Sequence, residues 1–180
     1  MASADQTIRN VVTGETSTFL VTAADSGGAL LELEMQADPN AAGGSEHIHP
    51  RIKETHQMLE GVLHFKLEGV ETTIEAGQRL EIPPGTAHSF WNADDRPART
   101  RVRFEPAGEF EHFMESYYAL AADGKLDAKG RPKLLQSALI GRRHIADIAL
   151  ARPPVFLQRL LYAALAPVAR VRGYRDRYPA

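Results

Sequence analysis

The sequence predicts a mainly β protein, a sandwich or barrel of short strands, that continues into an α-helical extension. Between Thr16 and Phe104 the side chains alternate between apolar and polar, and Gly or Pro turn signals separate the short segments. From Gly108 onward the apolar residues recur at helical spacing instead. We therefore expect a β-barrel domain at residues 1–106 and a helical extension at residues 107–180, packed on the barrel or on a dimer partner.

The β region shows both of the signals that short strands require. Leu31, Leu33 and Met35 share one parity while Glu32 and Glu34 have the other, which is typical of a strand with one buried face. Turn signals recur along the region: 26–28, 38–40, 43–44, 60–61, 68–69, 76–77 and 83–86. Many short strands without an intervening helical pattern indicate a sandwich or barrel.

Three helices are expected in the extension. Apolar and aromatic residues recur at helical spacing from Phe110 to Leu120, and Gly124 suits a C-terminal cap, so the first helix is expected at 109–122. Pro132 fits a helix first turn, and the periodic stretch after it runs from 134 to 150. A third helix of about 16 residues is expected from Val155.

Four candidate metal ligands lie between residues 46 and 92. His47 and His49 share a face if the backbone is extended, and residues 50–53 can turn the chain so that Glu54 returns from the next strand to the same interior. His88 opens a further strand after the turn at 83–86. Three imidazoles and one carboxylate suit a first-row divalent metal.

The spacing of these residues resembles the two motifs of the cupin superfamily, in particular its small single-domain, type-2-like members. The first motif, His-x-His, four residues, Glu, six residues, Gly, is met by His47, His49, Glu54 and Gly61. The second is met at every fixed position, by Gly77, Pro83, Gly85, His88 and Asn92. One departure is Ala41, where the family often has glycine; Gly43 and Gly44 lie close enough to serve the same turn.

The resemblance covers roughly residues 15 to 106 and implies a double-stranded β-helix, or jelly-roll barrel, whose interior holds one divalent metal ion (Fe, Mn, Ni, Cu or Zn) on His47, His49, Glu54 and His88. Strand parity places further side chains beside the site. His56 is a candidate general base or a buried structural imidazole, and the expected substrate-lining residues are Met58, Phe90, Leu63 and Phe65. His64, His112 and His144 are not expected to be ligands.

Composition limits the chemistry and the location. The chain of 180 residues contains no cysteine, which excludes disulfides, thiolate ligands and a nucleophilic thiol. No apolar run approaches the ~20 residues that span a bilayer, and the polar start lacks a secretory pattern, so we expect a cytoplasmic protein. The net charge of −2 is unevenly distributed: residues 131–180 hold ten Lys or Arg and two acids, which leaves about −10 for the remainder.

The third expected helix combines an apolar stripe with arginines. A membrane surface could bind such a pattern, but we expect the stripe to pack against the protein and the arginines to complement the acidic barrel. Nucleic-acid binding is not expected, because no known binding module is present and the pI is about 6.4. The stripe comprises Phe156, Leu157, Leu160, Leu161, Leu165 and Val168.

Two function classes remain. The cupin resemblance implies either a metal-dependent enzyme, dioxygenase-, isomerase- or cyclase-like, acting on a small and largely apolar or aromatic molecule, or a non-catalytic cupin that binds or senses a small molecule or metal. The complete ligand set favours the enzyme, although fold alone does not decide function. A homodimer is expected, because exposed strands at the edges of a small barrel need covering.

Overall fold

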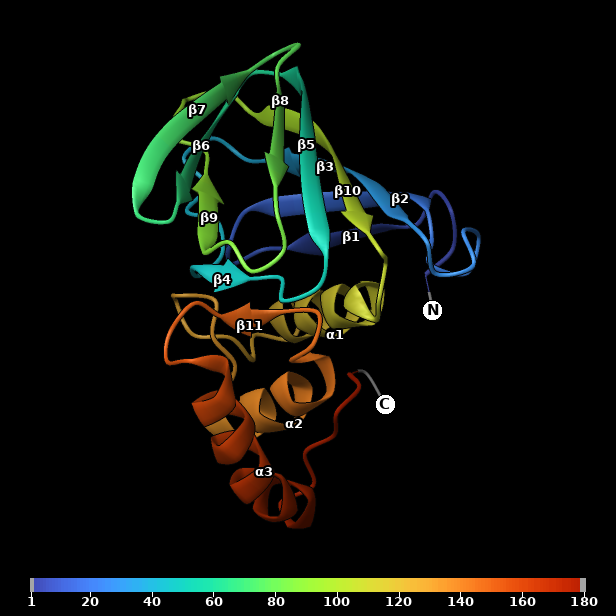
Figure 1. Ribbon diagram of the computed structural model, residues 1–180, viewed down its shortest axis with the longest axis vertical. Helices are drawn as coiled ribbons and strands as arrows, with labels where there is room; N and C mark the ends of the chain where they lie inside the picture. Colours follow the sequence, from blue (N-terminus) through green and yellow to red (C-terminus); the bar gives the residue numbers. More distant parts are fainter. Residues whose placement is uncertain (1, 179–180) are drawn as a thin grey trace.

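The computed structural model describes residues 2–178 and consists of two antiparallel β-sheets with three helices below them (Figure 1). The first sheet contains, in spatial order, β1 (Thr7–Asn10), β2 (Glu15–Val21), β3 (Leu31–Ala37), β10 (Ala98–Glu105), β5 (Lys53–Glu60) and β8 (Arg79–Ile82). The second contains β11 (Ala149–Leu150), β4 (His47–Ile48), β9 (His88–Trp91), β6 (Val62–Leu67) and β7 (Val70–Glu75). This is the predicted jelly roll; within residues 2–178 no strand pairing closes the two sheets into one barrel.

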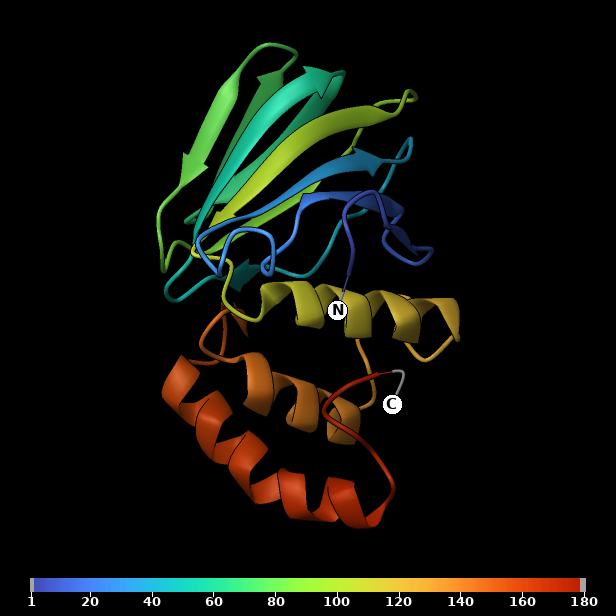
Figure 2. The same cartoon turned by 90° about the vertical axis from the view of Figure 1, so that its right-hand side faces the viewer.

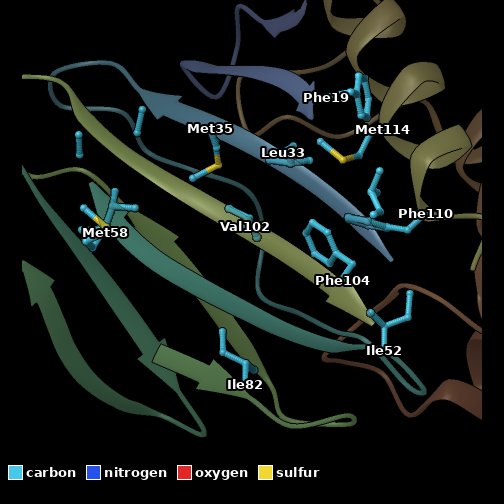
Figure 3. Close-up of a cluster of buried hydrophobic side chains, with 14 of the residues drawn as sticks. Phe19, Leu33, Met35, Ile52, Met58, Ile82, Val102, Phe104, Phe110 and Met114 are labelled. Atoms are coloured by element: carbon cyan, nitrogen blue, oxygen red, sulfur yellow. The ribbon is translucent and has the colours of Figure 1, made fainter. Parts of the chain in front are cut away.

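The core lies between the two sheets and continues onto the first helix. Inward residues of β2, β3 and β10 are almost fully buried, among them Phe19, Leu33 and Val102, as the alternation predicted. Figure 3 shows these side chains pointing toward one another, with Phe110 and Met114 of the helix completing the cluster. The apolar face of the helix therefore closes one end of the sandwich.

The helices are α1 (Phe110–Ala122), α2 (Leu134–His144) and α3 (Val155–Val171), stacked one below another beneath the sheets (Figure 2). The first and third match the predicted ranges. The second is shorter than the periodic stretch 134–150, because the chain turns after His144 and residues 149–150 form β11, which pairs with β4. The extension thus adds a strand to a sheet, whereas the sequence indicated only helices there.

The expectation that the apolar stripe of α3 packs against the protein is wrong. Its inner face, with Tyr162 and Ala166, packs on α2, but the predicted stripe lies on the opposite side. Leu165 is half-buried, and the other five members are exposed: Phe156, Leu157, Leu160, Leu161 and Val168. None of the helices within residues 2–178 has the length and apolar character needed to cross a bilayer.

Gly43 occupies a position where a side chain is excluded. Its φ is +65°, and an added Cβ would lie 1.8 Å from the carbonyl oxygen of Phe90 in β9, the strand that also carries His88. Gly44 next to it has open space around its Cα. The close contact with Phe90 is therefore the reason that position 43 requires glycine, whereas position 44 has room for a side chain.

We predict that Gly43→Ala lowers the free energy of unfolding by about 2 kcal/mol or more, because the strained φ and the clash with Phe90 add. Gly44→Ala is the matched control and should change it by less than about 0.5 kcal/mol. Urea denaturation of both variants tests this. Equal stability of the two variants would contradict the account of this turn.

Candidate metal centre

The four predicted ligands come together between the two sheets. His47 and His88 are cross-strand partners on β4 and β9, and their ring centroids lie 4.3 Å apart. His49 follows β4, and Glu54 faces them from β5 in the other sheet. One ligand atom from each of the four residues lies within 4.8 Å of the others. Spacing in the sequence and proximity in space therefore agree for the whole set.

Backbone carbonyls fix the orientation of all three imidazoles. The Nδ1–H of His47 donates to the backbone carbonyl oxygen of Ser45 (2.9 Å). The Nδ1–H of His49 donates to the backbone carbonyl oxygen of Asp147 (2.6 Å), and the Nδ1–H of His88 to that of Thr86 (2.8 Å). A carbonyl oxygen can only accept, so each Nδ1 carries a proton and each neutral ring keeps its lone pair on Nε2. These are the nitrogens available to a metal.

The three Nε2 atoms lie around the carboxylate of Glu54. Both kinds of group are hydrogen-bond acceptors, so neither can donate to the other. Glu54 Oε2 lies 2.9 Å from Nε2 of His88 and 3.3 Å from Nε2 of His49. The latter nitrogen is buried and has no hydrogen-bond partner within residues 2–178. Lone pairs that face one another in a buried site need a positive charge between them. A divalent metal ion supplies that charge, so the donor set fits the metal that the ligand spacing predicts.

The acid–base equilibria of these groups reflect the same geometry. Burial disfavours the charged form of Glu54, but His88 and the hydrogen bond from His56 outweigh it and hold the pKa of Glu54 well below its usual range. Burial likewise opposes protonation of His88, yet Glu54 raises the pKa of His88. Burial and the neighbouring rings lower the pKa of His47 well below normal. Both shifts have the same cause, the attraction between the Glu54 carboxylate and the protonated form of His88.

His56, the candidate general base, forms a hydrogen bond with the candidate ligand Glu54. Its Nε2–H donates to Glu54 Oε1 (2.7 Å), the oxygen that does not face His49 and His88. Its ring is fully buried and packs edge-on against Phe65 at 4.9 Å. His56 therefore orients the carboxylate, and its tautomer is opposite to that of the other three histidines.

The helical extension supplies part of the site. Asp147, which lies before β11, provides the carbonyl that holds His49, and its buried carboxylate accepts from Arg51 Nε (2.7 Å) and from the backbone N–H of Glu109 (2.9 Å). Phe110 at the start of α1 packs edge-on against His49 at 4.8 Å. Neither role could be predicted from the sequence, because no local pattern connects positions so far apart in the chain.

A cavity of about 520 Å³ extends from the ligands into the extension. Its inner end is lined by His47, His49, Glu54 and His56, and its walls are mostly apolar and aromatic. Beyond α1 it continues between α2, β11 and the start of α3, where its exposed lining residues include Leu134, Pro153 and Leu161. The sequence pattern could not reveal this cavity, because the cavity forms where the extension packs on the sheets.

The predicted lining residues divide into two groups. Phe90 faces the cavity as expected. Met58, Leu63 and Phe65 point inward, as their parity indicated, but they are fully buried in the core and do not line the cavity. The cavity is also lined by residues that the sequence did not indicate, among them, from β2, β10 and α1, Glu15, Phe104, Phe110, Met114, Tyr117 and Tyr118.

The other histidines lie apart from the group. His64 stacks on Trp91 at 5.6 Å, His112 pairs with Glu115 on α1, and His144 is buried at the end of α2 beside Phe113. None of the three contributes an atom to the four-residue group.

Comparisons with known proteins agree with this geometry. Residues 33–104 match the family described as the cupin domain. A stretch of 62 residues is 37% identical to the polyketide synthase CurC of Streptomyces cyaneus; it is 34% of this chain, and the chain spans about two fifths of that relative.

Solved structures similar to this chain include KdgF from a Halomonas species, with 19% identity, a TM-score of 0.49, and coverage of 59% of this chain and 94% of that one. An RmlC-like cupin from Shewanella frigidimarina has 23% identity and a TM-score of 0.49, with coverage of 62% and 94%. The polyketide cyclase RemF from Streptomyces resistomycificus has 20% identity and a TM-score of 0.47, with coverage of 58% and 70%. The family match over residues 33–104, the two-sheet jelly roll and the intact ligand motifs together show that this part of the chain is a cupin domain.

Proposed function

We propose that this cupin binds one divalent first-row metal ion on His47, His49, Glu54 and His88 and is an enzyme that acts on a small, largely apolar or aromatic molecule. The observation that carries the proposal is the convergence of three Nε2 lone pairs and a carboxylate beside a largely apolar cavity. A binding site for metal alone would not need a cavity of this size beside it.

The four residues leave room for a ligand beside the metal ion. Three nitrogens and one carboxylate do not complete the coordination of a five- or six-coordinate ion. When bound, the metal would act as a Lewis acid or as a site for dioxygen or a substrate oxygen. The protein's own contribution is to keep Glu54 and the three rings in place through His56 and the backbone carbonyls.

The cavity suits a molecule with one or more rings. Its volume of about 520 Å³ lies in the usual range for sites that enclose a small organic ligand. Phe104, Phe110 and Phe113 offer ring faces and edges, while Tyr117 and Tyr118 add hydroxyl groups. The curated relative is named a polyketide synthase, which supports an aromatic or polyketide-like substrate class.

Glu15 is a buried acid of this cavity that is not a metal ligand. It lies on β2, is buried, and accepts a hydrogen bond from the Tyr118 hydroxyl (2.8 Å). Burial raises the pKa of Glu15, and the charge of Glu54 adds to the increase. A carboxyl group with a raised pKa keeps its proton to a higher pH than an ordinary one and can exchange that proton with a bound molecule. We assign Glu15 this role in the proposed enzyme.

The metal assignment predicts that protein purified without chelator carries about one first-row metal ion per chain, and that His47→Ala or His88→Ala lowers this content sharply. Elemental analysis measures it. His64→Ala is the control, because His64 lies outside the group and should leave the content unchanged. Full metal content in the first two variants would refute the ligand assignment.

The enzyme assignment predicts turnover that depends on the metal. The protein is loaded anaerobically with iron(II), and oxygen uptake is then recorded with catechols, flavonols and small diketones. Product analysis under the same conditions, repeated with manganese, nickel and zinc, detects isomerisation or ring closure. We expect turnover with at least one aromatic substrate, and none with His88→Ala. Binding of these molecules without any turnover would instead favour a non-catalytic binding cupin.

Glu15→Gln is predicted to make the protein more stable at neutral pH than the wild type. Because the pKa of Glu15 is raised in the folded state, the wild type loses stability as pH rises from the ordinary Glu pKa of 4.5 through the pKa of folded Glu15. The variant has no titrating group at this position. The difference should disappear below pH 4.5. Unfolding is measured across pH, with Glu71→Gln on the exposed face of β7 as control. An unchanged pH dependence in Glu15→Gln would contradict the raised pKa.

A further inference from the structure

The outer face of α3 is a large apolar surface that the fold leaves uncovered. Phe156 and Leu160 are 62% and 65% exposed, and the surface also includes Leu157, Leu161, Val168 and Val171. These residues lie opposite Tyr162 and Ala166, which pack on α2. The helix is therefore apolar on two sides, and only one of them has a partner within residues 2–178. A contiguous apolar surface of this kind marks an interaction site.

Positive charge borders this surface. Arg159 and Arg170 lie on one flank by helical spacing and Arg172 on the other, and α3 itself contains no acidic residue. These three arginines are exposed and form no ion pair with the acids of residues 2–178. An apolar face bordered by arginines is the arrangement that lies flat on an anionic lipid surface.

The charge distribution argues for lipid and against a second copy of the chain. Antiparallel packing of two such faces would bring the flanking arginines of both copies together, and like charges would oppose the contact. An anionic bilayer attracts them instead. Figure 2 shows α3 as the layer farthest from the sheets, so docking on this face would keep the acidic part of the chain away from the negatively charged surface.

The docking surface adjoins the cavity. Leu161 belongs to the exposed surface and is also one of the residues that line the cavity, together with Pro153 and Tyr162. From there the lining continues past α2 and α1 to the metal ligands. Contact of this surface with a bilayer would bring the outer part of the cavity to the lipid, and an apolar molecule could then enter without crossing water.

We propose that the outer face of α3 docks on the surface of an anionic lipid bilayer and that the cavity receives its apolar ligand from that bilayer. The first part stands on the surface alone. The second rests on the proposed function, because it names the source of the molecule that the metal site would act on. The substrate class that follows is a lipophilic, ring-containing molecule dissolved in the membrane.

Flotation of the full chain with vesicles tests the docking. We expect the protein to float with phosphatidylcholine vesicles that contain phosphatidylglycerol, and much less with phosphatidylcholine alone or at high salt. The double variant Phe156→Ser, Leu160→Ser should lower the bound fraction at least about tenfold. Arg170→Gln with Arg172→Gln should lower it on anionic vesicles only. Val70→Ser, equally exposed but on β7, is the matched control and should float as the wild type does.

Two outcomes would overturn the docking proposal. One is a wild type that floats with neither kind of vesicle. The other is a dimer, seen by sedimentation velocity without lipid, that Phe156→Ser, Leu160→Ser converts to a monomer, since the face would then be an interface between copies. His88→Ala should float normally, so loss of metal and loss of lipid binding are separate results. Both serine substitutions are at exposed positions and leave the core intact.

Single-cysteine labelling tests the second part, and the absence of native cysteine makes it specific. Phe156→Cys, Leu161→Cys and Val70→Cys each receive a nitrobenzoxadiazole fluorophore. On anionic vesicles we expect a blue shift at positions 156 and 161 and none at position 70. A shift at 156 without one at 161 would show that the surface docks while the cavity faces water, and it would overturn the delivery of ligand from the bilayer.

Discussion

The structure depends on one electrostatic constraint, the meeting of three imidazole lone pairs with the carboxylate of Glu54 in a buried space. Each Nδ1 is committed to a backbone carbonyl, so the rings cannot turn to present a proton. Apposed acceptors in a buried site are costly unless a cation lies between them. A cation between these groups therefore stabilises the site: a metal ion would supply that charge, and the raised pKa of His88 has the same electrostatic cause.

Both sheets and the extension hold the four side chains in this arrangement. β4 and β9 present His47 and His88 to each other, and β5 brings Glu54 from the opposite sheet. Gly85, in the turn before β9, donates its N–H to the carbonyl oxygen of His49, which joins the two ligand motifs directly. From the extension, Asp147 fixes His49, and β11 pairs with β4 beside it (Figure 1). The extension is thus a structural part of the site as well as the wall of the cavity.

The sequence could predict what depends on local spacing. The ligand set follows from alternation within β4 and β5 and from the turn before β9, and strand parity correctly placed Met58 and Phe65 inward. Residues whose role depends on tertiary packing could not be found this way. Glu15 and Asp147 look like ordinary surface acids in the sequence, and their roles arise only where α1 and β11 meet the sheets. The packed face of α3 was misassigned because helical period does not say which of two apolar faces is buried.

The most direct test of the central constraint is the tautomeric state of the histidines, measured by long-range ¹⁵N NMR of the side chains with and without zinc. The account predicts Nδ1–H tautomers for His47, His49 and His88, with Nε2 resonances that shift on zinc binding, and the opposite Nε2–H tautomer for His56. In the metal-free state the raised pKa of His88 predicts that its ring takes up the second proton at a higher pH than an ordinary histidine does. Nε2–H tautomers at His47 or His49, or Nε2 resonances that zinc leaves unchanged, would contradict it.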